Sequence, residues 1–389
     1  MSVLRTMKTT AAVLDEVGGE FSIREVDLQH PLPEEVLVEI RGVGICHTDL
    51  AVKQGHLPFR FPGVLGHEGS GIVKAVGDNV QGFEVGDRVC LSFSNCGECR
   101  QCTAGEPSYC TQFRACNFQG TRLDGTTAIS QDGEPLGGHF FGQSSFSRHA
   151  VANQRSVVKV PEGVPLELAG SLGCGIQTGA GAVMNALQVG PGASLLITGG
   201  GSVGLAAVMA AAVQGVGTII VAEPVARRRE LAMQLGATHA FDPKAAPLSE
   251  QVKTVIAIGV DYAIDTTARP VVIAEVVASM AHRGTVGLLG VPTNPDQTLD
   301  ARLLQMNSQG LTFTGICEGN SDRVTFIPRL MDLYLAGNFP FDELVTRVPF
   351  AEIERGIELQ EQGEAVKVVL TIASDESFGP RETKRMVTA

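Results

Sequence analysis

The chain has 389 residues, of which 44% are hydrophobic and 19% are charged, and its formal net charge is -12. That length is too great for one ordinary core and predicts two globular domains of roughly 150 to 200 residues each. The negative charge argues against binding to nucleic acid or to an anionic membrane surface. The sequence shows no secretory signal and no apolar run of the ~20 residues that span a membrane, so we expect a cytoplasmic protein.

Short runs of alternating or β-branched residues, punctuated by glycine, occupy the first part of the chain, from residue 8 to about residue 158. Residues 35–40 and 71–76 are two examples of such runs. This pattern predicts a turn-rich β domain. At the two ends of the chain, residues 1–7 and 374–389 are expected to be mobile.

Three residues that lie far apart in this sequence are candidate ligands of one metal ion: Cys46, His67 and Cys174. A lone pair such as His67-Glu68 usually belongs to a solvated loop, so the metal prediction depends on the two cysteines as well. Two thiolates and an imidazole suit zinc, and three protein ligands leave the fourth tetrahedral position open for water or substrate. The hypothesis is therefore a catalytic zinc.

Four further cysteines form the pattern C-x2-C-x2-C-x7-C, namely Cys96, Cys99, Cys102 and Cys110. This spacing lets one loop wrap four thiolates around a tetrahedral ion, and it predicts a closed, structural zinc site. An iron-sulfur cluster or reduced free thiols are the alternatives. A disulfide framework is disfavoured because the nine cysteines are odd in number and the chain is long.

Beyond residue 165 the pattern becomes helical, and a buried strand at 194–198 then leads into a glycine-rich turn and a helix over 203–214. A second strand, 218–222, ends at an acidic residue. Glycines in this context allow a tight turn and bring a pyrophosphate close to the helix N-terminus, whose free amides favour anions. The candidate dinucleotide-binding residues are Gly199, Gly201, Ser202, Val203, Gly204 and Glu223.

Glu223 is expected to accept hydrogen bonds from the adenosine ribose hydroxyls and to repel a 2'-phosphate, which favours NAD over NADP. Arg227 and Arg228 argue the other way, because either side chain could bind a phosphate. On a helix predicted over 226–235, both are explained as well by solvated surface charge. Arg228 is kept as a candidate cofactor contact.

Strands and helices continue to alternate, and this predicts a doubly wound parallel sheet. The predicted elements are a strand near Ala240, helix 250–258, strand 262–265, helix 271–281, strands 285–289 and 311–315, helix 323–335, and strands 345–348 and 366–372. We assign the last strands back to the first domain. The expected division is a catalytic domain over 1–176 with a metal lobe at 95–113, a nucleotide domain over 177–317, a return to the catalytic domain over 318–373, and the tail 374–389.

With the ligand trio, the four-cysteine lobe and the nucleotide turn in this order, the sequence resembles the zinc-dependent medium-chain alcohol dehydrogenases over about residues 8–372. The stretches 141–146, 173–179 and 223–224 are most similar to bacterial members that act on aryl and allylic alcohols, such as benzyl alcohol and geraniol dehydrogenases. The resemblance implies an α/β fold in which a GroES-like β-rich catalytic domain joins a Rossmann domain. It also implies two zinc ions per subunit, NAD, a homodimer or homotetramer, and a small primary alcohol or aldehyde as substrate.

Carried over residue by residue, the resemblance makes Cys46, His67 and Cys174 the ligands of the catalytic zinc and the four-cysteine loop the structural site. Glu68 is then expected to tune the field of the ion and ligand exchange. Asp49 either orients His67 from the second coordination shell or caps a helix that begins near it.

The same resemblance implies that the Thr48 hydroxyl accepts the proton of the zinc-bound alcohol and passes it towards the ribose. The histidine that often ends this relay is missing, since Ala51 stands there, so water or His47 must complete the transfer. His47 and Lys367 are expected near the pyrophosphate. Thr178 is expected near the nicotinamide.

The substrate pocket implied by the resemblance surrounds the open zinc position and consists of Thr48, Leu57, Phe93, Phe140, Phe141 and Val291, the last shared with the cofactor site. Its rings suit a planar aromatic or conjugated substrate. Two alternative functions remain: a formaldehyde dehydrogenase that uses a thiol adduct, suggested by Arg114, and a non-catalytic member of the family. Retention of the zinc ligands and Thr48 argues against the second alternative.

Overall fold

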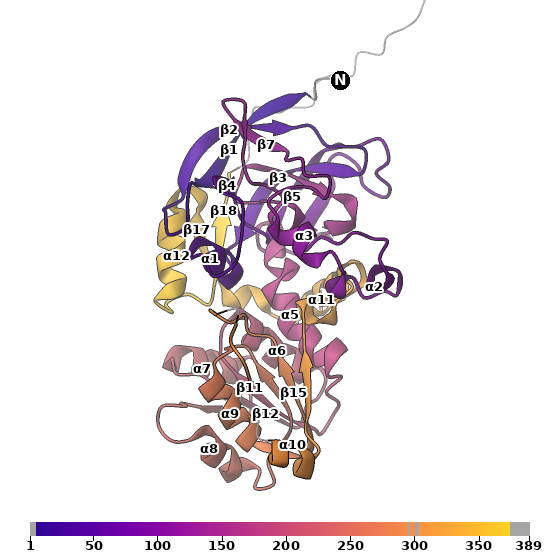
Figure 1. The fold of residues 1–389 in the computed structure, drawn as a ribbon. Coiled ribbons are helices and arrows are strands. Elements are labelled where there is room, and N and C mark those ends of the chain that lie inside the picture. Colours follow the sequence, from indigo (N-terminus) through magenta and orange to yellow (C-terminus); the bar gives the residue numbers. More distant parts are fainter. Residues whose placement is uncertain (1–4, 295, 300–302, 374–389) are drawn as a thin grey trace, which may run out of the picture.

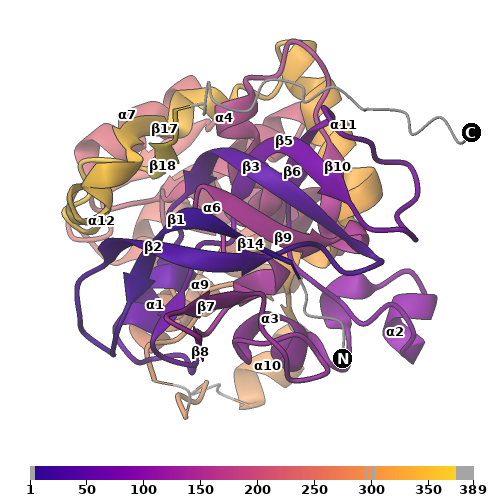
Figure 2. The ribbon, with the colours of Figure 1, turned by 90° about the horizontal axis from the view of Figure 1, so that it is seen from above.

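Three β-sheets organise the protein, and the computed structural model describes them over residues 5–294, 296–299 and 303–373. Two of the sheets lie at one end of the molecule, and the third, flanked by helices, lies at the other end (Figure 1). Seen from above, β1, β2, β3 and β9 lie across the first end, and α2 projects at its side (Figure 2). Among the residues that the structure describes, none of the helices combines the length and apolar character that a membrane crossing needs.

The two sheets of the first end are built mainly from antiparallel pairs. The five-stranded sheet has the order β4 (Gly63–Val64), β1 (Thr6–Leu14), β2 (Ser22–Gln29), β7 (Ile129–Gln131) and β8 (Glu134–Pro135). The seven-stranded sheet has the order β10 (Val157–Lys159), β6 (Arg88–Leu91), β5 (Gly69–Val76), β3 (Glu35–Gly44), β18 (Lys367–Thr371) and β17 (Val345–Pro349), and β9 (His149–Asn153) also pairs with β3.

Strand β3 is the centre of this end of the molecule. All but one of its ten residues are buried, because β5, β9 and β18 all pair with it. The pairing with β18 sets Gly44 opposite Val369, so a strand from the end of the described chain completes a sheet begun near its start. The expected return of the last strands to the first domain agrees with this pairing.

The third sheet is entirely parallel. Its order is β13 (His239–Phe241), β12 (Thr218–Ala222), β11 (Ser194–Thr198), β14 (Val260–Asp265), β15 (Met280–Leu288) and β16 (Thr312–Gly315). The strand order reverses between β11 and β14, and the carboxyl ends of strands at such a switch point form the ligand crevice of doubly wound sheets. The predicted parallel sheet is therefore present, and its crevice faces the antiparallel end.

The helices divide between the two ends of the molecule. The parallel sheet is accompanied by α6 (Ser202–Val213), α7 (Ala226–Gln234), α8 (Leu248–Val255), α9 (Pro270–Ala278) and α10 (Leu303–Gln309). The remaining helices are α1 (His47–Lys53), α2 (Arg100–Thr103), α3 (Phe113–Phe118), α4 (Leu166–Ala169), α5 (Gly175–Gly181), α11 (Arg323–Leu335) and α12 (Ile353–Glu361). In Figure 1, α1 lies on one side of the junction between the two ends and α6 on the other.

Several sequence predictions of element limits are wrong. The helix expected over 250–258 ends at Val255, and the strand expected over 285–289 begins at Met280. Thr6 and Met7 belong to β1, where they pair with β2, and are not part of a mobile end. The helix expected to reach Ala281 ends at Ala278, because β15 begins at Met280. Between them, the Ser279 hydroxyl donates a hydrogen bond to the Glu275 carbonyl in the last turn of the helix. A continuous apolar run does not reveal by periodicity where a helix gives way to a strand. The predicted tail, 374–389, lies outside the described residues.

Candidate active site

The structure brings together the three separated residues that the sequence predicted as metal ligands. Cys46 follows β3, His67 follows β4, and Cys174 precedes α5. The ligand atoms of these residues and of Glu68 all lie within 4.8 Å of one another. The Nε2 atom of His67 is buried and has no hydrogen-bond partner among the residues that the structure describes, as expected of an atom that faces a metal ion. The donor set therefore fits zinc.

Asp49 organises this cluster through both carboxylate oxygens. Its Oδ1 lies 3.0 Å from Nδ1 of His67 and also accepts from the Gly66 N–H, while Oδ2 accepts from the Cys46 N–H at 2.9 Å. The bond to Nδ1 directs Nε2 of His67 at the cluster. The bond to Cys46 caps α1, so the two alternatives for Asp49 hold together. A hydrogen bond from Cys174 lowers the pKa of the Cys46 thiol well below its usual range, which favours the thiolate.

Glu68 is fully buried beside the cluster and is paired with Lys367. The ammonium Nζ of Lys367 lies 2.8 and 2.9 Å from the two carboxylate oxygens of Glu68 and 3.1 Å from the carbonyl oxygen of Ile45. Burial nevertheless raises the pKa of Glu68 to about 7. Lys367 also lines the cleft, and its predicted contact with a pyrophosphate stays a prediction.

The four cysteines of the predicted structural site form a second cluster on the loop around α2. Their sulfur atoms are separated by 3.5 Å (Cys96–Cys110 and Cys99–Cys102), 3.9 Å (Cys96–Cys102) and 4.0 Å (Cys99–Cys110). A tetrahedral ion with ~2.3 Å bonds to sulfur requires a separation of about 3.8 Å. The backbone N–H groups of Cys102 and Thr111 lower the pKa of Cys99 to about 5, so this thiol is readily ionised. This cluster also fits zinc.

A cleft of about 600 Å³ joins the catalytic cluster to the glycine turn. Its lining includes Cys46, Cys174 and Thr178 together with Gly201, Ser202 and Val203, where α6 begins at the switch point of the parallel sheet. Gly199 has a φ of +98°, and a Cβ atom on Gly204 would lie 1.9 Å from the Gly199 carbonyl oxygen. The turn therefore requires glycine at both positions and leaves room for a dinucleotide.

Glu223 and Arg228 lie near the glycine turn at different depths. Glu223 is buried at the end of β12, where its carboxylate accepts from the N–H groups of Gly200 (2.6 Å) and Val225 (2.8 Å). Arg228 lines the cleft and donates to the Ala365 carbonyl at 3.1 Å. Its Nε atom is buried without a partner in the described part of the chain. Arg227 is exposed, in agreement with solvated surface charge.

The apolar wall of the cleft differs from the predicted one. Leu57, Phe141 and Val291 line it as expected, whereas Phe93 and Phe140 are fully buried behind it. The predictions for Phe93 and Phe140 are therefore wrong, because other elements cover them. The guanidinium group of Arg323 lies over the Phe93 ring at 4.6 Å, and Phe140 packs edge-on against His67 at 5.3 Å.

Two rings that the sequence analysis missed complete the wall: Phe113 and Phe118 of α3. Phe118 packs edge-on against Phe141 at 5.1 Å, and Phe113 does so at 6.2 Å. The only sequence signal was their position shortly after Cys110. That position does not show which face of α3 meets the cleft.

Of the groups proposed to carry the proton, Thr48 and His47 line the cleft, and position 51 provides none. Thr48 lines the cleft with its hydroxyl 3.8 Å from the Cys46 sulfur, and His47 is exposed at the rim. Ala51 is buried in α1. Arg114 lines a different surface hollow, with Phe59 and Arg60. Its guanidinium group is therefore outside the cleft, which weighs against the thiol-adduct alternative.

Glu318 is a buried carboxylate in the cleft that the sequence analysis did not select. Its Oε1 lies 3.8 Å from the Cys174 sulfur and its Oε2 lies 3.4 Å from the Thr178 hydroxyl. Burial raises the pKa of Glu318 to about 7. Thr178 lines the cleft as predicted, and this hydrogen bond fixes its side chain.

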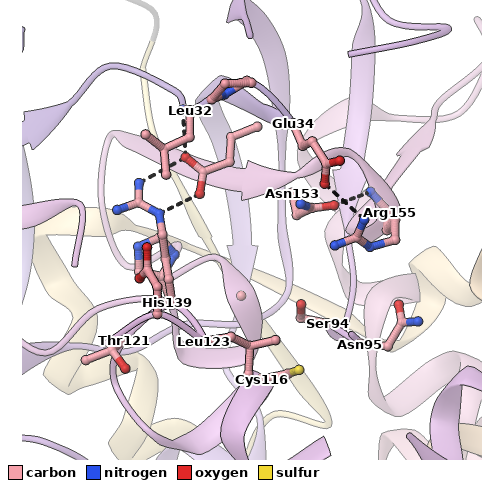
Figure 3. A pocket seen from close by; sticks show the side chains of 15 residues that line it. Leu32, Glu34, Ser94, Asn95, Cys116, Thr121, Leu123, His139, Asn153 and Arg155 are labelled. Atoms are coloured by element: carbon pink, nitrogen blue, oxygen red, sulfur yellow. Dashed lines mark hydrogen bonds and ion pairs between the residues drawn. The ribbon is translucent and has the colours of Figure 1, made fainter. Parts of the chain in front are cut away.

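A separate cavity of about 450 Å³ is lined by residues that include Asn153 at the end of β9 and Ser94, Asn95 and Cys116 (Figure 3). Its walls carry the buried ion pair between Arg122 and Glu35 and a second pair, 3.1 Å long, between Arg155 and Glu34. His139 also lines it, as Figure 3 shows. Thr48, Cys46 and Cys174 line the cleft and not this cavity, which contains none of the predicted metal ligands or cofactor contacts.

Fold and sites together define a two-domain, zinc-binding dehydrogenase with a dinucleotide cofactor. Comparison with known proteins gives the family. A family model of the alcohol dehydrogenase GroES-like domain matches residues 32–162, and a model of the zinc-binding dehydrogenases matches residues 202–334. The chain is 48% identical to a geraniol dehydrogenase of Castellaniella defragrans over 362 residues, which cover 92% of this chain and 96% of that protein. It belongs to the zinc-dependent medium-chain alcohol dehydrogenases, as its sequence predicts.

Two solved structures extend the comparison. The benzyl alcohol dehydrogenase of Acinetobacter calcoaceticus has a TM-score of 0.92 and 40% identity, and the match covers 94% of this chain and all of that one (100%). An alcohol dehydrogenase of Escherichia coli in complex with NADH has a TM-score of 0.78 and 26% identity over 94% of this chain and 99% of that one. The matches confirm the predicted fold of a GroES-like domain and a Rossmann domain.

Proposed function

We propose that this protein uses NAD and a catalytic zinc ion to interconvert primary aryl or allylic alcohols and their aldehydes. The observation that carries this proposal is the position of three phenylalanine rings, Phe113, Phe118 and Phe141, on the cleft that joins Cys46 and Cys174 to the glycine turn. The similarity to a geraniol dehydrogenase and to a benzyl alcohol dehydrogenase supports it.

The residues of the cleft have separate tasks in this reaction. Zinc held by Cys46, His67 and Cys174 would supply Lewis-acid chemistry that eases deprotonation of an alcohol, and NAD would accept the hydride. The Thr48 hydroxyl takes the proton inside the cleft. With alanine at position 51, the proton continues to water or to His47 at the exposed rim.

Asp49 and the paired Glu68 and Lys367 support this chemistry from behind the ligands. Asp49 keeps the Nδ1 proton of His67 and directs Nε2 at the ion. The carboxylate of Glu68 adds negative charge next to the ligands, and Lys367 balances it. The side chains of Asp49, Glu68 and Lys367 are therefore already in place around the metal ligands before a substrate binds.

The phenylalanine wall accounts for the proposed substrate class. A planar ring or a conjugated alkene placed against Phe113, Phe118 and Phe141 gains apolar burial and edge or offset contacts of ~0.5 to 1.5 kcal/mol each beyond the area term. Ethanol gains almost none of this. Conjugation also stabilises the aldehyde product, which eases hydride departure from a benzylic or allylic carbon.

The remaining parts of the proposal concern the cofactor, the second metal and the assembly. Glu223 lies directly beneath the glycine turn, where its carboxylate disfavours a 2'-phosphate, so we propose NAD over NADP. The two cysteine clusters lead us to propose two zinc ions per subunit. A homodimer or homotetramer is proposed from the resemblance alone. A cytoplasmic location and domain limits at residues 176 and 317 are proposed from the sequence.

A substrate comparison tests the function. With NAD in excess, kcat/KM for benzyl alcohol, cinnamyl alcohol or geraniol should exceed that for ethanol by at least ~100-fold, which requires ~2.7 kcal/mol of differential transition-state binding. Formation of the reduced cofactor provides the measurement, with NADP and added glutathione as parallel conditions. Ethanol or a secondary alcohol as the best substrate, with poor activity on benzyl alcohol, would overturn the proposal.

A matched pair of variants tests the wall. Phe118→Ala should lower the ratio of kcat/KM for benzyl alcohol to that for ethanol about tenfold, because a ring contact of ~1.4 kcal/mol is lost. Phe93→Ala should leave the ratio unchanged and destabilise the fold by roughly 3 kcal/mol or more, because Phe93 is fully buried outside the cleft. An equal change of the ratio in both variants would contradict the assignment of the wall.

A further inference from the structure

Tyr109, a residue of the four-cysteine lobe, is hydrogen-bonded to the segment 315–320. This residue directly precedes Cys110 and ends the short helix Pro107–Tyr109. The Tyr109 N–H donates to the Glu106 carbonyl at 3.0 Å, and the Cys110 N–H donates to the Pro107 carbonyl at 3.2 Å. The loop that ligates the metal therefore fixes the starting point of the Tyr109 side chain.

The hydroxyl group of Tyr109 is bonded to a loop more than two hundred residues away in the sequence. It donates to the Gly315 carbonyl at 3.1 Å and accepts from the Cys317 N–H at 3.4 Å. It also contacts Oδ1 of Asn320. The Tyr109 hydroxyl is thus bonded at three points along the segment 315–320, which begins at the last residue of β16.

That segment forms part of the cleft wall. Ile316, Cys317 and Glu318 line the cleft, on the wall that also carries Thr178. Glu318 and Asn320 have φ angles of +47° and +50°, which non-glycine residues adopt only when the surroundings hold them there. Holding this segment in its strained conformation is therefore a condition for a preformed cleft.

Two sets of contacts hold it. From the side of α5, the Asn185 amide donates to the Gly319 carbonyl at 3.3 Å, and Glu318 is bonded to Thr178. From the side of the lobe, Tyr109 provides the bonds described above. The lobe is also tied to the start of α11, because Asn95 contacts the Arg323 guanidinium and donates to the Cys102 sulfur at 3.1 Å.

We infer that Tyr109 is a positioning residue for the dinucleotide: it holds the 316–318 wall in place, so the structural metal lobe sets cofactor affinity as well as stability. This inference rests on the proposed use of a nicotinamide dinucleotide. It concerns one hydroxyl group, whose removal leaves the ring, the lobe and the metal ligands unchanged.

Fluorescence titration with NADH, and with NADPH in parallel, tests the inference on the metal-loaded protein. Tyr109→Phe should weaken NADH binding about fivefold, the effect of losing one net hydrogen bond. The KM for NAD should rise while kcat does not fall. Tyr334→Phe is the matched control, because it also removes a bonded hydroxyl, 3.4 Å from Asp342, at a site outside the cleft lining.

Metal content and melting temperature separate positioning from a merely structural role. Tyr109→Phe should keep both metal sites filled, and its melting temperature should equal that of Tyr334→Phe. Asn320→Gly, which tolerates the φ of +50° at this position, should weaken NADH binding by no more than Tyr109→Phe does, and the double variant should bind NADH as Tyr109→Phe does, because the Asn320 contact is one of the three that Tyr109→Phe removes.

The possible failures are distinct. Equal NADH affinity in Tyr109→Phe and the unchanged protein would overturn the inference and leave the proposed function standing. Loss of metal or a large fall in melting temperature in Tyr109→Phe would assign the effect to folding and also overturn it. An unchanged protein that binds neither NADH nor NADPH would overturn the proposed cofactor, and the inference with it.

Discussion

The two cysteine clusters of this protein are assembled in opposite ways. The thiols of the lobe come from one loop between residues 96 and 110, and Cys99 and Cys102 remain half-exposed. The proposed catalytic ligands come from residues 46, 67 and 174, and they meet only where β3, the β4–β5 connection and α5 pack together. A closed loop site thus depends on local spacing, whereas an open catalytic site depends on the whole domain.

The difference predicts opposite consequences of the same substitution, Cys to Ser. Cys174→Ser should lower activity roughly 1,000-fold or more, because several kcal/mol of charge stabilisation are lost, while the fold and the lobe metal remain. Activity, metal content and circular dichroism are the measurements. Full activity with a single zinc ion, or iron with sulfide in place of zinc, would contradict the assignment of one catalytic and one structural zinc to the two clusters.

Cys99→Ser should do the reverse. A closed site contributes its binding energy to folding, so loss of this ligand should reduce the free energy of unfolding by about 3 kcal/mol or more. Activity measured well below the melting temperature and at saturating NAD should persist. Thermal unfolding with and without a zinc chelator provides the measurement, and a variant as stable as the unchanged protein would show that the lobe needs no metal.

Asp49→Asn sharpens the comparison within the catalytic cluster. The amide keeps the size of the side chain but weakens the bond to Nδ1 of His67, which is 3.0 Å long. Affinity for the catalytic zinc should fall about 10- to 100-fold, and the lobe metal should be unaffected. Competition with a chromogenic chelator measures both sites, and parallel loss of the two metals would contradict the assignment.

A buried histidine outside both clusters, His139, predicts how stability depends on pH. Burial, supported by the Arg122 charge, lowers the pKa of His139 to about 4, and its Nε2 accepts from the Ala128 N–H. Between about pH 6.5 and pH 4 the unfolded chain binds a proton that the folded chain does not, so stability falls as pH falls, by up to ~1.4 kcal/mol per pH unit.

Urea unfolding at several pH values checks this prediction. His139→Asn retains a side chain that tolerates the left-handed backbone at this position, where φ is +55°. Its stability should depend less on pH than that of the unchanged protein. An identical dependence would assign the acid sensitivity to other groups, such as the carboxyls near the metal ligands.

The cleft shows where sequence reasoning reached its limit. The spacing of Cys96 to Cys110 and the glycine turn were readable because each is a local pattern with one geometric solution. Phe140 and Phe141 are neighbours in the sequence, yet one is behind the cleft and the other on its wall. Their difference arises from the turn at Phe141, whose φ is +49°, and from the packing of α3 against it.

By itself, the sequence determined the order of strands and helices, the lobe cysteines and the dinucleotide turn, because hydrophobic period and residue spacing act over short distances. The residue types also suggested Cys46, His67 and Cys174 as ligands, and the resemblance to a known family added the roles of their neighbours. Only the tertiary structure decided that Lys367 binds Glu68, that Phe113 replaces Phe93 on the wall, and that Glu318 enters the cleft. These outcomes depend on which side chains converge when distant segments pack, and a linear pattern does not contain that information.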